Sequence, residues 1–233
     1  YTYAKNILDS CDKDAILFTF GDNDTFPVWA LQEAYGYRRD IKVVNMSLLN
    51  TDWYVEQMKF TYNVPMSLTR EQIRHTVYMM QGKQEFSRPA EQFVDRPRNR
   101  KTFMIPNPWE GRILTVANMI MEDIVLENRW QYPVFFTSPP YAESPLGLRA
   151  RTVQVGVVYR LDREPPTSQI DLDKSDQLFR ETYSYAGYQN SKVYRDENAT
   201  GIFLGVGIAS TRVVDELIQM DDRERATRLT RHI

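Results

Sequence analysis

The chain has 233 residues, of which 42% are hydrophobic and 26% charged, as in folded globular proteins of one large domain or two small ones. Its formal net charge of -2 creates no field that would attract nucleic acid, and no apolar run reaches the roughly 18 residues of a membrane-spanning helix, so we expect no membrane insertion. With one cysteine and two histidines, an internal disulfide and a Cys- or His-rich metal centre are excluded, and Cys11 is interpreted as a core residue.

The first third of the chain alternates predicted helices and buried strands. The run "AILFTF" is apolar throughout and ends at Gly21, which is typical of a strand buried on both faces. "TFPVWALQEAYG" predicts a helix, because Pro27 is tolerated in a first turn and Gly36 suits a C-terminal cap. Short connections favour a right-handed parallel unit. We expect a helix over 2–11, strands over 15–20 and 41–49, and a further helix after Asn50 or Thr51.

The middle of the chain contains one long polar segment among further predicted elements. Thr69 and Gln72 have the spacing of a capping box, which predicts a helix to about residue 80. Residues 81–100 are polar and contain two prolines, so they are predicted to form a surface loop. Further elements are predicted as a helix over 111–130, a strand over 133–138 and a longer strand over 152–161.

These elements predict an α/β fold, a three-layer, mostly parallel sheet with flanking helices. We expect this α/β domain to span residues 1–162. Residues 163–233 are predicted to be a linker and a helical segment, which could pack on the first domain. The segment contains two helices around a tight turn near Asp221, as in one unit of a helical repeat array.

Carboxylate and amide side chains follow two consecutive predicted strands. In an open parallel sheet the carboxyl ends of the strands line the ligand crevice, so these residues are a candidate binding site. The candidates are Asp22, Asn23, Asp24 and Thr25 after the first strand, and Asn50, Asp52 and Trp53 after the second. Thr137, Ser138 and Glu143 would join them if their strand is a neighbour.

The same residues have other interpretations. Asp, Asn and Thr are favoured helix N-caps, worth about 1 kcal/mol each, so the cluster could serve capping alone. Asp22 and Asp24 also match the Asp-x-Asp pattern by which glycosyltransferases hold a divalent metal, the one weak cofactor candidate in a chain for which we expect none. A calcium loop is rejected because Phe26 and Pro27 occupy its ligand positions. A haloacid dehalogenase-type phosphatase is disfavoured because Thr25 comes one position early.

Several motifs carry a family resemblance. "GDNDTFP", "LQEAYGYRRD" and "VVNMSLLNTDWY" resemble a block found in the DUF2723 family, large polytopic bacterial membrane proteins similar to the vertebrate transmembrane protein O-mannosyltransferase. "NRWQYPVFFT" and "VGVVYRL" resemble later segments of the family, so the likeness covers roughly residues 1–220. The chain also begins without Met, and we interpret it as a piece of a longer protein.

The resemblance implies where such a chain would act. In this family a membrane-embedded half similar to lipid-sugar-dependent glycosyltransferases precedes a soluble part on the periplasmic face of the bacterial inner membrane, which often continues into tetratricopeptide-like repeats. The catalytic loop of such enzymes lies in the membrane half, so no catalytic residue carries over. We expect an extracytoplasmic domain that partners its own N-terminal membrane domain and binds or presents acceptor polypeptide or glycan. The alternatives are a metal-dependent phosphoryl or glycosyl transferase using Asp22 and Asp24, and a structural interaction module.

Overall fold

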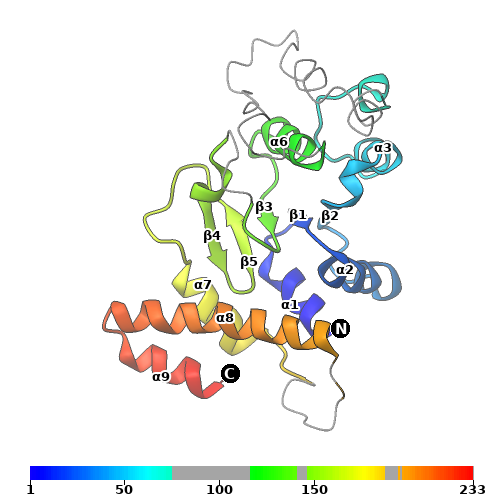
Figure 1. Ribbon diagram of the computed structural model, residues 1–233. Coiled ribbons are helices and arrows are strands. Elements are labelled where there is room, and N and C mark those ends of the chain that lie inside the picture. Colours follow the sequence, from blue (N-terminus) through cyan, green and yellow to red (C-terminus); the bar gives the residue numbers. More distant parts are fainter. Residues whose placement is uncertain (75–115, 141–145, 187–193, 195, 233) are drawn as a thin grey trace. The chain divides into compact units, whose positions relative to one another are not determined.

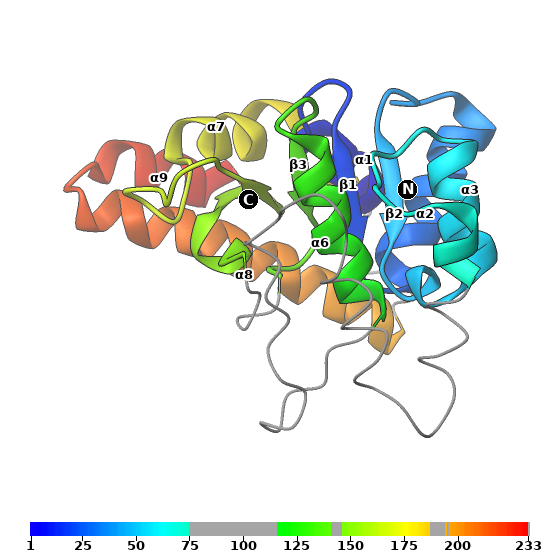
Figure 2. The ribbon, with the colours of Figure 1, turned by 90° about the horizontal axis from the view of Figure 1, so that it is seen from above.

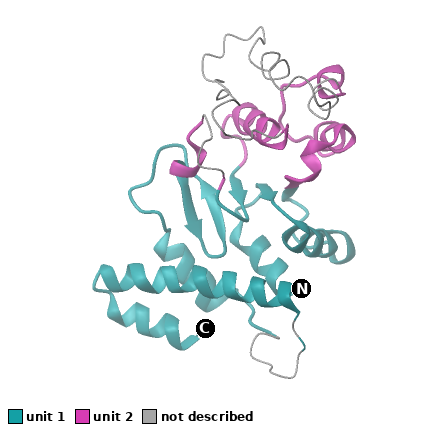
Figure 3. Ribbon diagram, viewed as in Figure 1, with its two compact units in different colours: residues 1–43, 133–139, 151–233 teal, residues 44–132, 140–150 magenta. Residues whose placement is uncertain are grey.

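The computed structural model describes residues 1–74, 116–140, 146–186, 194 and 196–232 (Figure 1). The chain divides into two compact units whose segments alternate along the sequence (Figure 3). Unit 1 comprises Tyr1–Val43, Pro133–Pro139 and Arg151–Ile233, and unit 2 comprises Val44–Tyr132 and Pro140–Ala150.

The first elements of unit 1 lie where the sequence predicts them. α1 (Thr2–Ser10) buries its apolar face, and the four residues of β1 (Ile16–Thr19) are all buried. α2 (Asp22–Tyr35) begins three residues earlier than expected, so Pro27 falls in its second turn rather than its first. Gly36 ends the helix as predicted, with a left-handed φ of 66° that glycine adopts without strain.

The sheet is mixed, with strand order β2–β1–β3–β5–β4. β1 and β3 pair in parallel, whereas β3 with β5 and β5 with β4 pair antiparallel. The α/β class is therefore confirmed, but the mostly parallel sheet is not, and the three-layer arrangement stays a prediction. The remaining strands are β2 (Lys42–Asn45), β3 (Val134–Phe136), β4 (Thr152–Val155) and β5 (Val158–Leu161).

The prediction of a single strand over 152–161 is wrong, because the segment folds back on itself at Gly156. β4 and β5 form a hairpin in which Thr152 lies opposite Leu161. Gly156 has a φ of 59°, and a Cβ atom there would lie 1.9 Å from the hydroxyl oxygen of Tyr183. That hydroxyl also accepts a hydrogen bond from the Val157 N–H at 3.0 Å. Glycine is thus required both by the turn and by the close approach of Tyr183.

Helices from the C-terminal part complete the core of unit 1. α7 (Leu172–Gln177) runs into a π-helical turn over Leu178–Thr182. α8 (Glu197–Gln219) follows, and α9 (Arg223–His232) folds back beside it after Asp221 (Figures 1 and 2). The expected helix pair is present, and its likeness to a tetratricopeptide repeat stays a prediction. One buried apolar cluster joins sheet and helices, including Ile7, Leu17, Phe135, Phe179 and Val213.

A buried carboxylate ties α9 to α7. Asp176 is 2% exposed and accepts hydrogen bonds from Arg180 at 2.8 and 2.9 Å and from Arg225 at 3.2 Å. Burial on its own would raise the pKa of Asp176, but the hydrogen bonds and charges of Arg180 and Arg225 outweigh it and hold the pKa below its ordinary value of 3.8.

This ion-pair cluster predicts a pH-dependent stability. A carboxyl whose pKa is lowered by folding contributes stability that is fully present above its unfolded pKa and is lost as the pH falls through the folded value. We expect Asp176→Asn to cost about 2 kcal/mol near neutral pH. The difference in the free energy of unfolding between Asp176→Asn and the native chain should become smaller below pH 3.8.

Urea unfolding over a pH series measures this difference. The control is Asp173→Asn, since the Asp173 side chain also pairs with Arg225 but is 92% exposed, and its cost should stay within about 0.5 kcal/mol. A difference for Asp176→Asn that does not change with pH would contradict the prediction.

Unit 2 contains α3 (Asp52–Phe60) and α6 (Val116–Asn128). The predicted capping box is confirmed, because the Thr69 N–H donates to Gln72 Oε1 at 2.8 Å and the Gln72 N–H donates to Thr69 Oγ1 at 3.2 Å. The strand predicted over 41–49 ends early, at Asn45, whose side chain accepts from the Leu48 N–H and starts a turn.

Two remaining predictions concern the loop and the membrane. The loop predicted over 81–100 and the start of the helix predicted over 111–130 lie outside the described residues. Within the described ranges, no helix is long and apolar enough to cross a membrane.

Candidate functional site

The β1–α2 turn directs Asp24 inward, onto the backbone. Asp24 is 8% exposed, and its two carboxylate oxygens accept from the N–H groups of Phe20 at 2.9 Å and Gly21 at 2.8 Å. The Thr137 hydroxyl at the end of β3 also donates to it. The carboxylate thus satisfies N–H groups that precede the helix and also ties β3 to the turn.

Thr25 also faces inward. It is buried, and its hydroxyl oxygen lies 2.6 Å from the Gly21 carbonyl oxygen and 2.7 Å from the hydroxyl oxygen of Thr19. The prediction that Thr137 would join Asp24 is confirmed, since β3 is the parallel neighbour of β1. Ser138 is exposed, and Glu143 lies outside the described residues.

The other side chains of the same motif face solvent. Asp22 and Asn23 are exposed, and neither side chain makes a hydrogen bond or ion pair with any described residue. Phe26 is 51% exposed and contacts Trp29, with ring centroids 5.7 Å apart. Residues three and four positions apart are neighbours on a helix surface, so Asp22, Asn23, Phe26 and Trp29 form one polar and aromatic surface, called here the α2 patch.

The second set of predicted site residues lies in unit 2. Asn50 donates to the Ser47 carbonyl at 3.1 Å and accepts from the Ala117 N–H at 3.2 Å, which connects the turn before α3 to α6. Asp52 accepts from the Trp53 N–H at 2.7 Å. Trp53 is 57% exposed. Because the two sets belong to different units, each is a separate candidate, and the single crevice predicted from the sequence stays a prediction.

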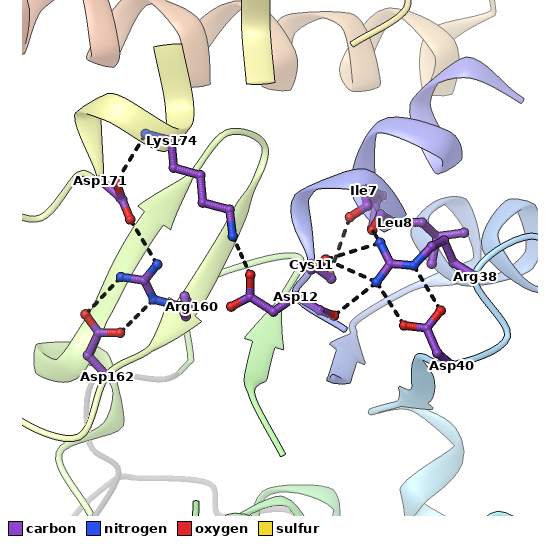
Figure 4. Close-up of polar contacts among 10 residues, drawn as sticks. All are labelled: Ile7, Leu8, Cys11, Asp12, Arg38, Asp40, Arg160, Asp162, Asp171 and Lys174. Carbon is purple, nitrogen blue, oxygen red and sulfur yellow. Dashed lines mark hydrogen bonds and ion pairs between the residues drawn. The ribbon is translucent and has the colours of Figure 1, made fainter. Parts of the chain in front are cut away.

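At the opposite end of β1, Arg38 holds the end of α1. Its guanidinium donates to the carbonyls of Leu8 at 2.8 Å, Cys11 at 3.2 Å and Asp12 at 3.0 Å (Figure 4). It also pairs with Asp40 through two hydrogen bonds of 2.9 Å, and these hold the pKa of Asp40 below its ordinary value. A cation at these positions donates to carbonyls at and just beyond the C-terminal end of α1 and complements the helix dipole.

Further charged contacts continue from this cluster to the C-terminal helices. Lys174 at the start of α7 contacts the Asp12 carboxylate, and Arg160 on β5 bonds Asp162 at 2.8 Å and Asp171 at 2.9 Å (Figure 4). Each of these charges has a partner within unit 1, which is typical of a structural network rather than of a reactive site.

No group suited to a resident metal is found in the described residues, where three or more His, Cys, Asp or Glu side chains nowhere converge. Both oxygens of Asp24 already accept hydrogen bonds from the Phe20 and Gly21 N–H groups. Cys11 is buried, its thiol donates to the Ile7 carbonyl, and burial raises its pKa, all consistent with the predicted core role.

Sequence reasoning did not assign roles to Arg38 or Phe26. Both stand inside motifs that carry the family resemblance, and the signal for Arg38 was the Arg-x-Asp pair of Arg38 and Asp40, which begins two residues after the helix-ending Gly36. For Phe26 the signal was an aromatic residue four positions after Asp22, and the two share a helix face because α2 begins at Asp22 rather than at the predicted Thr25.

Comparison with known families supports the resemblance in part. No curated protein and no solved structure matches the chain. A likeness to the DUF2723 family as a whole stays an expectation. Residues 1–105 match the family model described as TMEM260-associated domain 2, a family linked to a membrane protein similar to protein O-mannosyltransferases.

Proposed function

We propose that this chain is a domain of a TMEM260-like membrane protein and that it binds acceptor polypeptide or its glycan beside the membrane-embedded part. In this proposal the domain lies on the periplasmic face of the bacterial inner membrane, partners its own membrane domain, and does not catalyse transfer alone. The family match over residues 1–105 supports the first part of the proposal.

The binding role is supported by the division of labour within the "GDNDTFP" motif. The side chains of Asp24 and Thr25 form hydrogen bonds within unit 1, whereas those of Asp22, Asn23 and Phe26 face solvent. Asp22 and Asn23 form no hydrogen bond or ion pair with a described residue, which leaves their polar groups accessible to a ligand. Carboxylate and amide groups can pair with sugar hydroxyls or peptide amides, and an aromatic face can stack on the apolar side of a sugar ring or peptide.

A titration tests the α2 patch. We expect the chain to bind an O-mannosylated serine/threonine peptide, with Phe26→Ala and Asp22→Ala each weakening the affinity about tenfold, the equivalent of about 1.4 kcal/mol. The unmodified peptide and free mannose are the two comparison ligands, and they show whether polypeptide or sugar supplies the contact. Isothermal calorimetry or chemical-shift titration measures all three.

The matched control is Tyr35→Ala at the far end of α2, since Tyr35 is 69% exposed and lies outside the patch. Asp52→Ala tests the separate candidate in unit 2. Binding that survives both α2 substitutions but not Asp52→Ala would move the site to unit 2. If none of the three ligands binds at millimolar concentration, the proposal is contradicted.

A further inference from the structure

One side of α8 exposes apolar residues to solvent. The buried face of the helix carries Val206, Ser210, Val213 and Leu217. On the opposite side, Leu204 and Ile208 are 62% and 63% exposed. At about 3.6 residues per turn this side forms one continuous line, called here the α8 stripe, which consists of Glu197, Gly201, Leu204, Gly205, Ile208 and Arg212.

The stripe borders an open hollow of about 590 Å³. Thr200, Phe203, Gly207 and Thr211 extend its lining along the same helix. Among the described residues, every side chain that lines the hollow belongs to α8, so this half of the helix presents a surface that no other described element covers.

Among the residues that the structure describes, none packs on the glycines of α8. A glycine inside a helix lowers its stability relative to alanine. At Gly201, Gly205 and Gly207 an added Cβ atom would meet no other atom within 4 Å among the described residues. Small residues on a helix surface allow the backbone of a second helix to approach closely. Their open surroundings therefore favour close contact with a second helix.

The α8 stripe is complementary to itself when reversed. If a second α8 lies antiparallel with its centre between Leu204 and Gly205, residue numbers on opposite helices sum to 409 at each level. Leu204 then faces Gly205, and Ile208 faces Gly201, so each large side chain meets a glycine. At both ends Glu197 faces Arg212, and neither of these forms an ion pair with a described residue of its own chain.

We propose that a second copy of this chain docks on the α8 stripe in this antiparallel register, forming a two-fold symmetric dimer. A two-fold axis uses the same patch on both chains, which is why a self-complementary stripe is its requirement. Bulky-to-glycine packing supplies the central contact, and the two Glu197–Arg212 pairs fix the register. The proposal is independent of acceptor binding by the α2 patch.

The expected dimer is weak. One pair of helices packed along a seam of about 22 Å buries an area at or below the low end of specific protein interfaces. We therefore expect a dissociation constant of the dimer in the micromolar range or above. In sedimentation velocity the mass should move from 27.4 kDa towards twice that value as the concentration rises.

Charge reversal tests the partner and the register together. Arg212→Glu places a carboxylate opposite Glu197 at both ends and should weaken the dimer tenfold or more, as should Glu197→Arg. Combining the two substitutions restores opposite charges and should return the dimer. Gly205→Leu should abolish it by filling the space that Leu204 of the other copy needs, and the open surroundings of Gly205 leave the fold of each chain intact.

The control is Ile218→Ala, because Ile218 is an exposed apolar residue of α8 outside the stripe, and its substitution should leave the dimer unchanged. A native chain that stays monomeric at millimolar concentration would overturn the proposal, and so would a dimer that Gly205→Leu leaves intact. The proposal would also be overturned if each single charge reversal produced monomers and the double variant did not form the dimer again. The proposed pairing of Glu197 with Arg212 would then be absent.

Discussion

Asp24→Ala is expected to lower the free energy of unfolding by about 3 kcal/mol, because two backbone N–H groups and one hydroxyl lose a charged acceptor together. The Phe20 and Gly21 N–H groups donate to separate oxygens of this carboxylate, at 2.9 and 2.8 Å. Losing the Thr137 contact also removes a tie between β3 and the start of α2. Urea unfolding measures this change as a lower midpoint concentration of urea, with an unchanged dependence of the free energy of unfolding on urea concentration.

Asp24→Asn should be nearly as damaging, although it preserves shape. The two N–H donors bind different oxygens, so an amide would turn its NH₂ group towards one of them. Asp22→Ala is the matched control, since it removes the same charge from the same helical turn at an exposed position. Its cost should be about 0.5 kcal/mol, from the helix dipole alone. Equal costs for Asp22 and Asp24 would contradict the structural role assigned to Asp24.

Arg38→Ala is expected to cost about 3 kcal/mol as well, since it leaves the end of α1 and the Asp40 carboxylate without their shared donor. Arg38→Lys should recover little of this loss. A lysine keeps the charge but cannot direct a planar fork at Leu8, Cys11 and Asp40 at once.

The neighbouring arginine provides the comparison. Arg39→Ala removes a side chain that is 59% exposed and whose contacts with the described residues are confined to the end of α2, so its cost should stay below about 1 kcal/mol. Thermal or urea unfolding of Arg38→Ala, Arg38→Lys and Arg39→Ala measures these three costs. If Arg38→Lys is as stable as the native chain, charge rather than fork geometry holds α1, and the assignment fails.

Elements with local signals were predictable from the sequence. The capping box of Thr69 and Gln72, the C-terminal glycine of α2 and the apolar run of β1 depend on residues a few positions apart, and all three are confirmed. The hairpin at Gly156 was missed because its turn contains no polar residue and interrupts an apolar run. The turn also packs against Tyr183, a residue distant in sequence whose contact no local pattern reveals.

The candidate site was predictable in position but not in orientation. The sequence placed Asp22, Asp24 and Thr25 at the end of a strand, and they lie there. Which of them turns inward depends on the acceptor needs of the preceding backbone and on Thr137, 113 residues away from Asp24. The antiparallel pairing within the sheet was likewise not predictable, because buried strands can show apolar runs in either kind of pairing.

The burial of Cys11 also makes the chain a convenient subject for probe chemistry. A thiol-directed reagent needs the thiolate, and here the only thiol is shielded and held protonated. A fluorophore or spin label attached to a new surface cysteine would therefore mark that position alone. In the unaltered chain, the rate at which Cys11 is alkylated would report how often α1 detaches from the core, which is the opening that Arg38 opposes.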